Sequence, residues 1–150
     1  MIDSAQVRKQ SSSRVLLVED NLDGVLIRQC LLEEIGCQVV IARSGADALA
    51  KFDSEDAFDL VVTDYKMPEM DGAELVEQLR SKGFDRPIVL VSGFADSLDL
   101  AKQVPGATVV IQKSSHEAQH LTRAVKKLLT PKKPASSAAA KRAAAQAGSK

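Results

Sequence analysis

The chain has 150 residues, of which 45% are hydrophobic and 27% are charged, so it is long enough for one domain with a buried core. No apolar run reaches the length of a membrane-spanning helix, and the polar N-terminus is unlike a signal peptide, so we expect a cytoplasmic protein without a membrane segment. The formal net charge of zero hides an acidic main part and a basic tail, because residues 131–150 hold five Lys or Arg and no acid.

Short apolar runs rich in β-branched residues alternate with helical patterns along the chain. Strands are predicted at residues 15–18, 39–41, 60–63, 87–91 and 109–111. Helices are predicted to begin near residues 21, 44, 72, 97 and 115. Because each strand is apolar throughout and the connections are short, we expect a parallel sheet with helices on both faces. The fold class is therefore α/β, a single doubly wound domain over residues 14–130.

The predicted first helix has recognisable ends and an apolar side. Asn21 is typical of a helix N-cap, and Gly36 is typical of a residue that follows a helix. Ile27, Leu31 and Ile35 recur at helical spacing, so we expect them to face the core.

Two later helices show comparable patterns. The third helix is expected to open at Gly72 and to carry Leu75, Val76 and Leu79 on one face. The last helix is expected at about residues 115–129.

The central stretch is residues 59–72, in which a buried strand stops at Asp64. Pro68 and Gly72 then mark a loop and the start of a helix. Taken alone, Asp64 could simply end a strand or begin a turn, as aspartate often does. Open α/β sheets, however, bind ligands at the carboxyl ends of their strands, where Asp64 is expected to lie.

Other polar residues are predicted at the same edge of the sheet. Glu19 and Asp20 follow the first strand, Ser92 ends the fourth, and Lys113 follows the fifth. Three neighbouring carboxylates repel one another, and a hard divalent cation such as Mg²⁺ removes that cost. A lysine and a hydroxyl can both bind phosphoryl oxygens. The set therefore favours an aspartate that attacks phosphorus as a nucleophile.

These residues resemble the response regulator receiver domains of two-component signalling. The resemblance covers roughly residues 14–129 and rests on Glu19-Asp20, Asp64, Met67-Pro68, Asp71-Gly72, Ser92-Gly93 and Lys113. It implies the flavodoxin-like receiver fold, with five parallel strands in the order 2-1-3-4-5.

The resemblance also implies a role for each matching residue. Asp64 would be the phosphoacceptor, and Ser92 and Lys113 would contact the phosphoryl group. The Mg²⁺ ligands would be Asp20, Asp64 and the backbone carbonyl of Lys66, together with Glu19 acting through a water molecule. The phosphoryl donor would be a sensor histidine kinase or a histidine phosphotransfer protein, while the downstream target is not indicated.

Three positions bear on how a signal would leave the domain. Val110 stands where the family often has an aromatic switch residue, so we expect another route, such as movement of residues 92–100. Ser114 stands where the family usually has a proline after a cis bond, so we predict a trans Lys113–Ser114 bond. Phe94 is interpreted as a loop anchor, with a gate or partner contact as the alternative.

Two other functions compete with phosphoryl acceptance. One is a receiver-like interaction module that is never phosphorylated. The other is a phosphohydrolase, which would need a second acid/base carboxylate and a cap, and neither is indicated by the sequence. We therefore expect a signalling domain rather than an enzyme. Since residues 131–150 hold no helix-turn-helix, its output is expected to pass through protein contacts, unless the chain belongs to a larger protein.

The remaining features are assigned structural roles. Residues 1–13 are expected to be a flexible arm, and the basic, alanine-rich residues 131–150 a disordered tether. Binding of nucleic acid by this tail is the weaker interpretation, since no aromatic residue accompanies its charges. Cys30 and Cys37 are expected to be reduced. His116 and His120 are expected on a solvated face rather than at a metal.

Overall fold

The strands and helices follow the predicted order. The computed structural model describes residues 12–93 and 102–130. The elements are β1 (Arg14–Val18), α2 (Leu22–Glu34), β2 (Gln38–Ala42), α3 (Gly45–Ser54), β3 (Leu60–Asp64), α4 (Gly72–Ser81), β4 (Ile88–Ser92), β5 (Val109–Gln112) and α6 (Glu117–Leu129). Most of the helix predicted at residues 97–103 lies outside the described residues, as do Phe94, most of the N-terminal arm and the whole tail.

The five strands pair in parallel in the order β2-β1-β3-β4-β5, which confirms the expected sheet. The register places Val18 beside Ala42 on one side and Thr63 on the other, and it places Asp64 beside Val91. Neighbouring strands therefore end at nearly the same level. As a result, the residues that follow them meet at one edge of the sheet.

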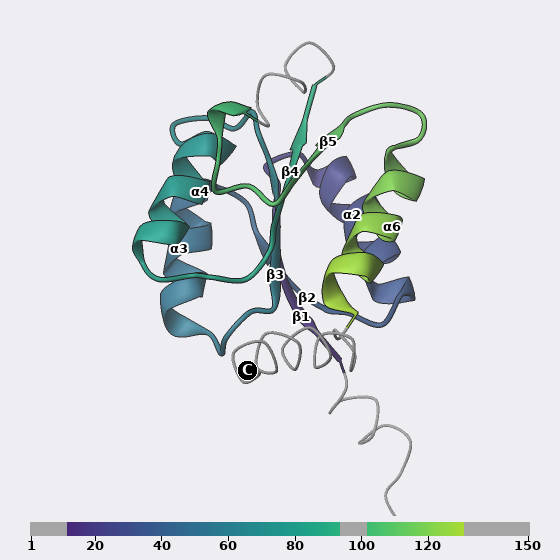
Figure 1. The fold of residues 1–150 in the computed structure, drawn as a ribbon, viewed down its shortest axis with the longest axis horizontal. Helices are drawn as coiled ribbons and strands as arrows, with labels where there is room; N and C mark the ends of the chain where they lie inside the picture. The colour runs from purple at the N-terminus through teal and green to yellow at the C-terminus, as the bar shows by residue number, and fades with distance from the viewer. Residues whose placement is uncertain (1–11, 94–101, 131–150) are drawn as a thin grey trace, which may run out of the picture.

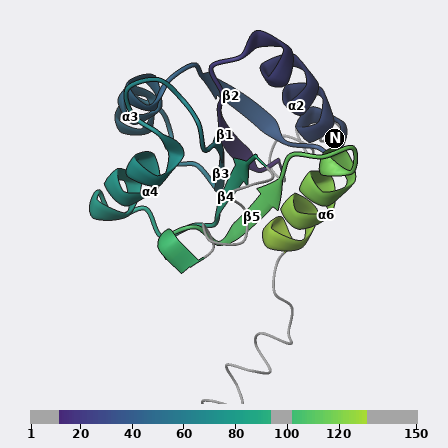
Figure 2. The same ribbon diagram turned by 90° about the horizontal axis from the view of Figure 1, so that it is seen from above.

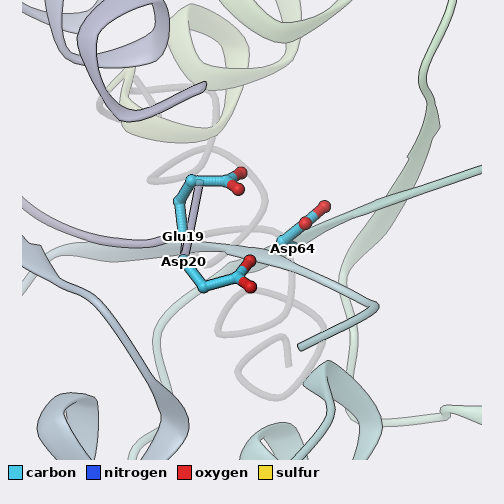
Figure 3. Close-up of side chains that lie close together, drawn as sticks. All are labelled: Glu19, Asp20 and Asp64. Atoms are coloured by element: carbon cyan, nitrogen blue, oxygen red, sulfur yellow. The ribbon is translucent and has the colours of Figure 1, made fainter. Parts of the chain in front are cut away.

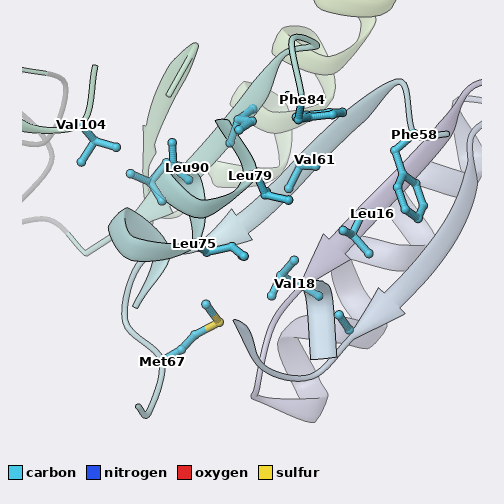
Figure 4. Close-up of a cluster of buried hydrophobic side chains, with 14 residues drawn as sticks. Leu16, Val18, Phe58, Val61, Met67, Leu75, Leu79, Phe84, Leu90 and Val104 are labelled. Atoms are coloured by element: carbon cyan, nitrogen blue, oxygen red, sulfur yellow. The ribbon is translucent and has the colours of Figure 1, made fainter. Parts of the chain in front are cut away.

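The sheet lies between two layers of helices. Figures 1 and 2 show α3 and α4 over one face and α2 and α6 over the other. Successive residues of β1 serve the two sides in turn: Leu16 and Val18 belong to the core under α3 and α4 (Figure 4), and Val15 and Leu17 to the core under α2 and α6. Because both faces are covered, the strands show no alternation of apolar and polar residues.

Polar side chains cap the helix starts at the predicted places. The Asn21 side chain accepts a hydrogen bond from the Gly24 N–H over 3.1 Å at the start of α2. Asp71 and Glu74 form a capping box at α4. Gly36, just past α2, has a φ of 95°, a conformation that glycine adopts without steric cost. The predicted stop of this helix is confirmed.

The prediction of which α2 residues face the core is wrong at one position, Ile27. Leu31 and Ile35 pack against the core, but Ile27 is 60% exposed. The buried residues of this helix are Val25, Arg28 and Leu32. Apolar residues occur on several sides of α2, so its spacing pattern alone did not show which side faces the sheet. Packing against the sheet and α6 determines which side of α2 faces inward, and it buries Arg28 on that side.

The end of the domain matches the expectations except for one boundary. Helix α6 begins at Glu117, about two residues later than predicted, and His116 at its start makes no side-chain capping bond. No peptide bond in the described ranges is cis, so the predicted trans Lys113–Ser114 bond is confirmed. Val110 packs partly buried against the core.

Two further properties concern the described residues. Cys30 is exposed and Cys37 is buried, and both are free thiols. None of the helices within residues 12–93 and 102–130 combines the length and the apolarity needed to cross a bilayer.

Candidate functional site

Three carboxylates gather where β1 and β3 end. Glu19 and Asp20 follow β1 directly, and Asp64 is the last residue of β3. One oxygen from each carboxylate lies within 4.8 Å of the others. Figure 3 shows the three side chains close together. Glu19 and Asp64 are buried, whereas Asp20 is exposed, so the cluster opens to solvent on one side. The predicted convergence of these acids is observed.

Lys113 reaches the buried carboxylate of Asp64 from the end of β5. Its Nζ lies 2.8 Å from Oδ1 and donates a hydrogen bond to Oδ2 over 3.1 Å. The backbone N–H of Lys113 donates to the carbonyl of Ser92 over 2.8 Å, which ties the ends of β4 and β5 together. The lysine therefore arrives at Asp64 from a fixed backbone position.

One oxygen of Asp64 is suited to a further ligand. Oδ1 is buried and accepts no well-aligned hydrogen bond from any residue that the structure describes, although the charge of Lys113 is near. A buried carboxylate oxygen without a hydrogen bond is costly. Three clustered carboxylates of which one has such an oxygen fit a hard cation such as Mg²⁺.

The loop after β3 is built around a close approach to Asp64. The Gly72 N–H donates to the Tyr65 carbonyl over 2.7 Å and closes the loop. A Cβ on Gly72 would lie 2.5 Å from the Asp64 carbonyl oxygen, so only glycine fits there. Lys66 is exposed within this loop, and the role of its carbonyl as a ligand stays a prediction.

Glu19 is held differently from the other two acids. Its Oε2 accepts a hydrogen bond from the Asn21 N–H over 3.0 Å, and its Oε1 forms an ion pair with Nη1 of Arg28. Burial raises the pKa of the Glu19 carboxyl; the bond from Asn21 opposes the rise, and the negative charge of Asp64 adds to it.

Arg28 is the residue of this region that the sequence analysis missed. It is buried, and its Nε also donates to Oε2 of Glu117 on α6 over 2.8 Å. Burial opposes its charge, but Glu117, Glu19 and Asp64 outweigh that effect and raise the pKa of the guanidinium. Its spacing from Val25 and Leu32, three and four residues away, was the signal that could have placed it on the inner face.

The other predicted residues lie as follows. Ser92 is buried at the end of β4, and its hydroxyl donates to the Gly93 carbonyl over 3.2 Å. His116 and His120 are exposed with ring centroids 6.1 Å apart. Among the described residues, they belong to no group of three or more potential metal ligands.

Comparison with known proteins decides the family. The family model for the response regulator receiver domain matches residues 15–126. The chain belongs to this family. Receiver domains are signalling modules of two-component systems rather than enzymes in the usual sense, and the match extends from β1 into α6.

Relatives of this receiver domain include both long signalling proteins and isolated domains. Hybrid signal transduction histidine kinase L of Dictyostelium discoideum is 38% identical over an alignment of 96 residues, and the match covers 59% of this chain and 6% of that protein. The chain thus spans a small part of that kinase.

Solved structures of receiver proteins match the fold. A CheY-like receiver domain protein of Methanospirillum hungatei is 28% identical with a TM-score of 0.70, covering 79% of this chain and 94% of that one. Response regulator TrrA of Thermotoga maritima, solved in complex with Mg²⁺ and BeF, is 32% identical with a TM-score of 0.68, covering 77% and 98%.

Proposed function

We propose that this receiver domain accepts a phosphoryl group on Asp64 from a phosphohistidine of a sensor histidine kinase or a histidine phosphotransfer protein, in a magnesium-dependent reaction. The main support is the Asp64 carboxylate itself: it is buried, lies 2.8 Å from Lys113 and is clustered with two other acids. That a relative is a hybrid histidine kinase supports the class of donor.

The transfer exchanges one bond to phosphorus for another. A carboxylate oxygen of Asp64 attacks phosphorus, a P–O bond forms, and the P–N bond to the donor histidine breaks. The imidazole leaves with the electron pair of that bond and takes up a proton, and Asp64 becomes an acyl phosphate. Lys113 neutralises charge on the transferring oxygens, and the Ser92 hydroxyl donates a hydrogen bond to one of them.

The acidic cluster would hold the metal. The proposed ligands are Glu19, Asp20, Asp64 and the backbone carbonyl of Lys66. When bound, Mg²⁺ would supply positive charge beside the oxygens of the phosphoryl group. The carboxylate cluster, the Asp64 Oδ1 atom without a hydrogen bond, and the magnesium in the TrrA structure support this choice.

Phosphorylation would then change the protein contacts of the domain. The ion pair between Lys113 and Asp64 links the site to the end of β5, so a new charge on Asp64 acts on that strand. Val110 on β5 has no ring to reorient, and we propose that the signal leaves through residues 92–100. A location in the cytoplasm stays a prediction.

Labelling of the full chain tests the proposal. The protein is incubated with MgCl₂ and acetyl phosphate, and its intact mass is measured. We expect the mass of one phosphoryl group, lost on treatment with hydroxylamine, which cleaves acyl phosphates. Asp64→Asn should take up none.

A matched control keeps the test specific. Asp56 is an exposed aspartate before β3, and Asp56→Asn should be labelled like the wild type. Label that persists in Asp64→Asn would contradict the assignment. A wild-type protein that is labelled by neither acetyl phosphate nor a phosphohistidine donor would instead favour the interaction module.

A further inference from the structure

A second positively charged side chain, besides Lys113, contacts the acidic cluster. Arg28 is 5% exposed on the inner face of α2, so its guanidinium is almost completely removed from water. It forms an ion pair with Glu19 and donates a hydrogen bond over 2.8 Å to Glu117 on α6. A buried charge of this kind is costly unless it is paired, and here two acids from different parts of the chain share it.

The same contacts keep Glu19 against α2. Both of its carboxylate oxygens are engaged, one by Arg28 and the other by the Asn21 N–H. The carboxyl carbon lies so close to Gly24 that a Cβ there would be 3.0 Å from it. Glu19 therefore has both an ion pair, with Arg28, and a hydrogen bond from a backbone N–H.

We propose that Arg28 is a positioning residue of the metal site, which holds Glu19 against α2 and competes with the divalent cation for its charge. Arg28 thereby lowers the affinity of the cluster for the cation. Glu117 limits this effect, because its carboxylate also forms an ion pair with the guanidinium and partly neutralises it. The inference rests on the proposed metal site, but it does not depend on phosphoryl transfer.

Coulomb's law gives the direction of each effect. Glu19, Asp20 and Asp64 attract a divalent cation, and Lys113 and Arg28 repel it. Removing Arg28 leaves the attraction of Glu19 uncompensated, so binding should strengthen. Removing the charge of Glu117 leaves Arg28 with Glu19 as its main partner. Because Glu117 then no longer offsets the repulsion between Arg28 and the cation, binding of the cation should weaken. A purely structural role of the network would instead make both substitutions weaken binding.

Calorimetric titration of the full chain with MgCl₂ at pH 8 tests the inference. We expect Arg28→Met to lower the dissociation constant by about three- to tenfold and Glu117→Gln to raise it by roughly threefold. Arg28→Lys keeps the charge and should stay within about twofold of the wild type.

Two further variants separate electrostatics from folding. Arg28→Met combined with Glu117→Gln removes the half-buried carboxylate that Arg28→Met alone leaves without its partner, and it should still bind Mg²⁺ more tightly than the wild type. Arg14 lies at the opposite end of β1, with roughly 13 Å of strand between it and the cluster. Arg14→Met therefore removes one positive charge elsewhere and should leave the dissociation constant unchanged.

The outcomes distinguish this inference from the proposed function. If the Arg28→Met variant and the double variant fold but bind Mg²⁺ no more tightly than the wild type, the role proposed for Arg28 is overturned, while the metal site itself stands. Tighter binding by Glu117→Gln would overturn the role given to Glu117. Absence of binding in every variant would overturn the metal site itself, whether or not Asp64 is labelled.

Discussion

Lys113 and Asp64 are 49 residues apart in the sequence, yet the lysine Nζ lies 2.8 Å from the Asp64 Oδ1. If this ion pair serves phosphoryl transfer, Lys113→Met should slow the labelling of Asp64 by acetyl phosphate by roughly one to two orders of magnitude, because charge on the transferring oxygens is no longer neutralised. Rates from intact mass at a fixed MgCl₂ concentration measure the effect. Lys126→Met, which removes an exposed lysine of α6, is the control and should react at the wild-type rate. Equal rates for all three proteins would contradict the role of Lys113.

Gly72 leaves no room for a side chain beside Asp64. A Cβ would lie 2.5 Å from the Asp64 carbonyl oxygen and 2.7 Å from a methyl group of Leu90, so Gly72→Ala should lower the free energy of unfolding by about 1–3 kcal/mol. Urea denaturation measures the loss. Gly93→Ala is the matched control, since a Cβ there meets no atom of the described residues within 4 Å. If both variants lost the same stability, the close approach would not be the cause.

Glu69 has a φ of 66°, in the left-handed region that costs a residue with a side chain roughly 1–2 kcal/mol. Glycine avoids this cost, but it loses more backbone entropy on folding than glutamate does. The net effect of Glu69→Gly should be a rise in the free energy of unfolding of about 0.5–1 kcal/mol. Thermal or urea unfolding measures the gain.

The same substitution in a helix should have the opposite sign. Glu77→Gly, on the exposed side of α4, should destabilise the protein by about 1 kcal/mol because glycine is a poor helix former. A loss of stability in Glu69→Gly would contradict the assignment of strain to this loop position.

The two thiols should react at different rates. Burial raises the pKa of Cys37, and the charge of Asp59 raises it further, so little thiolate is present at pH 8. We expect iodoacetamide to modify the exposed Cys30 first and to reach Cys37 only when the protein unfolds, as mass spectrometry of the wild type and of Cys30→Ser, each with and without urea, would show.

The raised pKa of Cys37 also gives a sign for stability. The folded protein keeps the thiol proton more tightly than the unfolded chain does. The contribution of Cys37 is therefore fully present below the ordinary thiol pKa of about 8.5 and is lost as the pH rises through the folded-state value. Rapid modification of Cys37 in the folded protein would contradict its burial.

The sequence by itself determined the order of the described strands and helices, and it placed Glu19, Asp20, Asp64 and Lys113 at the ends of strands, where the structure brings them together. Runs such as residues 60–63 are apolar because both faces of the sheet are covered, and this local pattern can be recognised in the sequence alone. Since parallel strands end at one edge, Asp64 and Lys113 could be placed together from their positions after strands. The resemblance to receiver domains then supplied the order of the strands and the role of each site residue.

Only the tertiary structure decided which side of α2 faces inward. The rotation of a helix about its axis depends on the surfaces that it packs against, and these come from β1, β2 and α6. That packing exposes Ile27 and buries Arg28 between Glu19 and Glu117, the second of which lies 89 positions after the arginine in the chain. The spacing of Arg28 from Val25 and Leu32 could suggest that it faces inward, but it does not identify Glu19 and Glu117 as its partners, because both lie outside the helix.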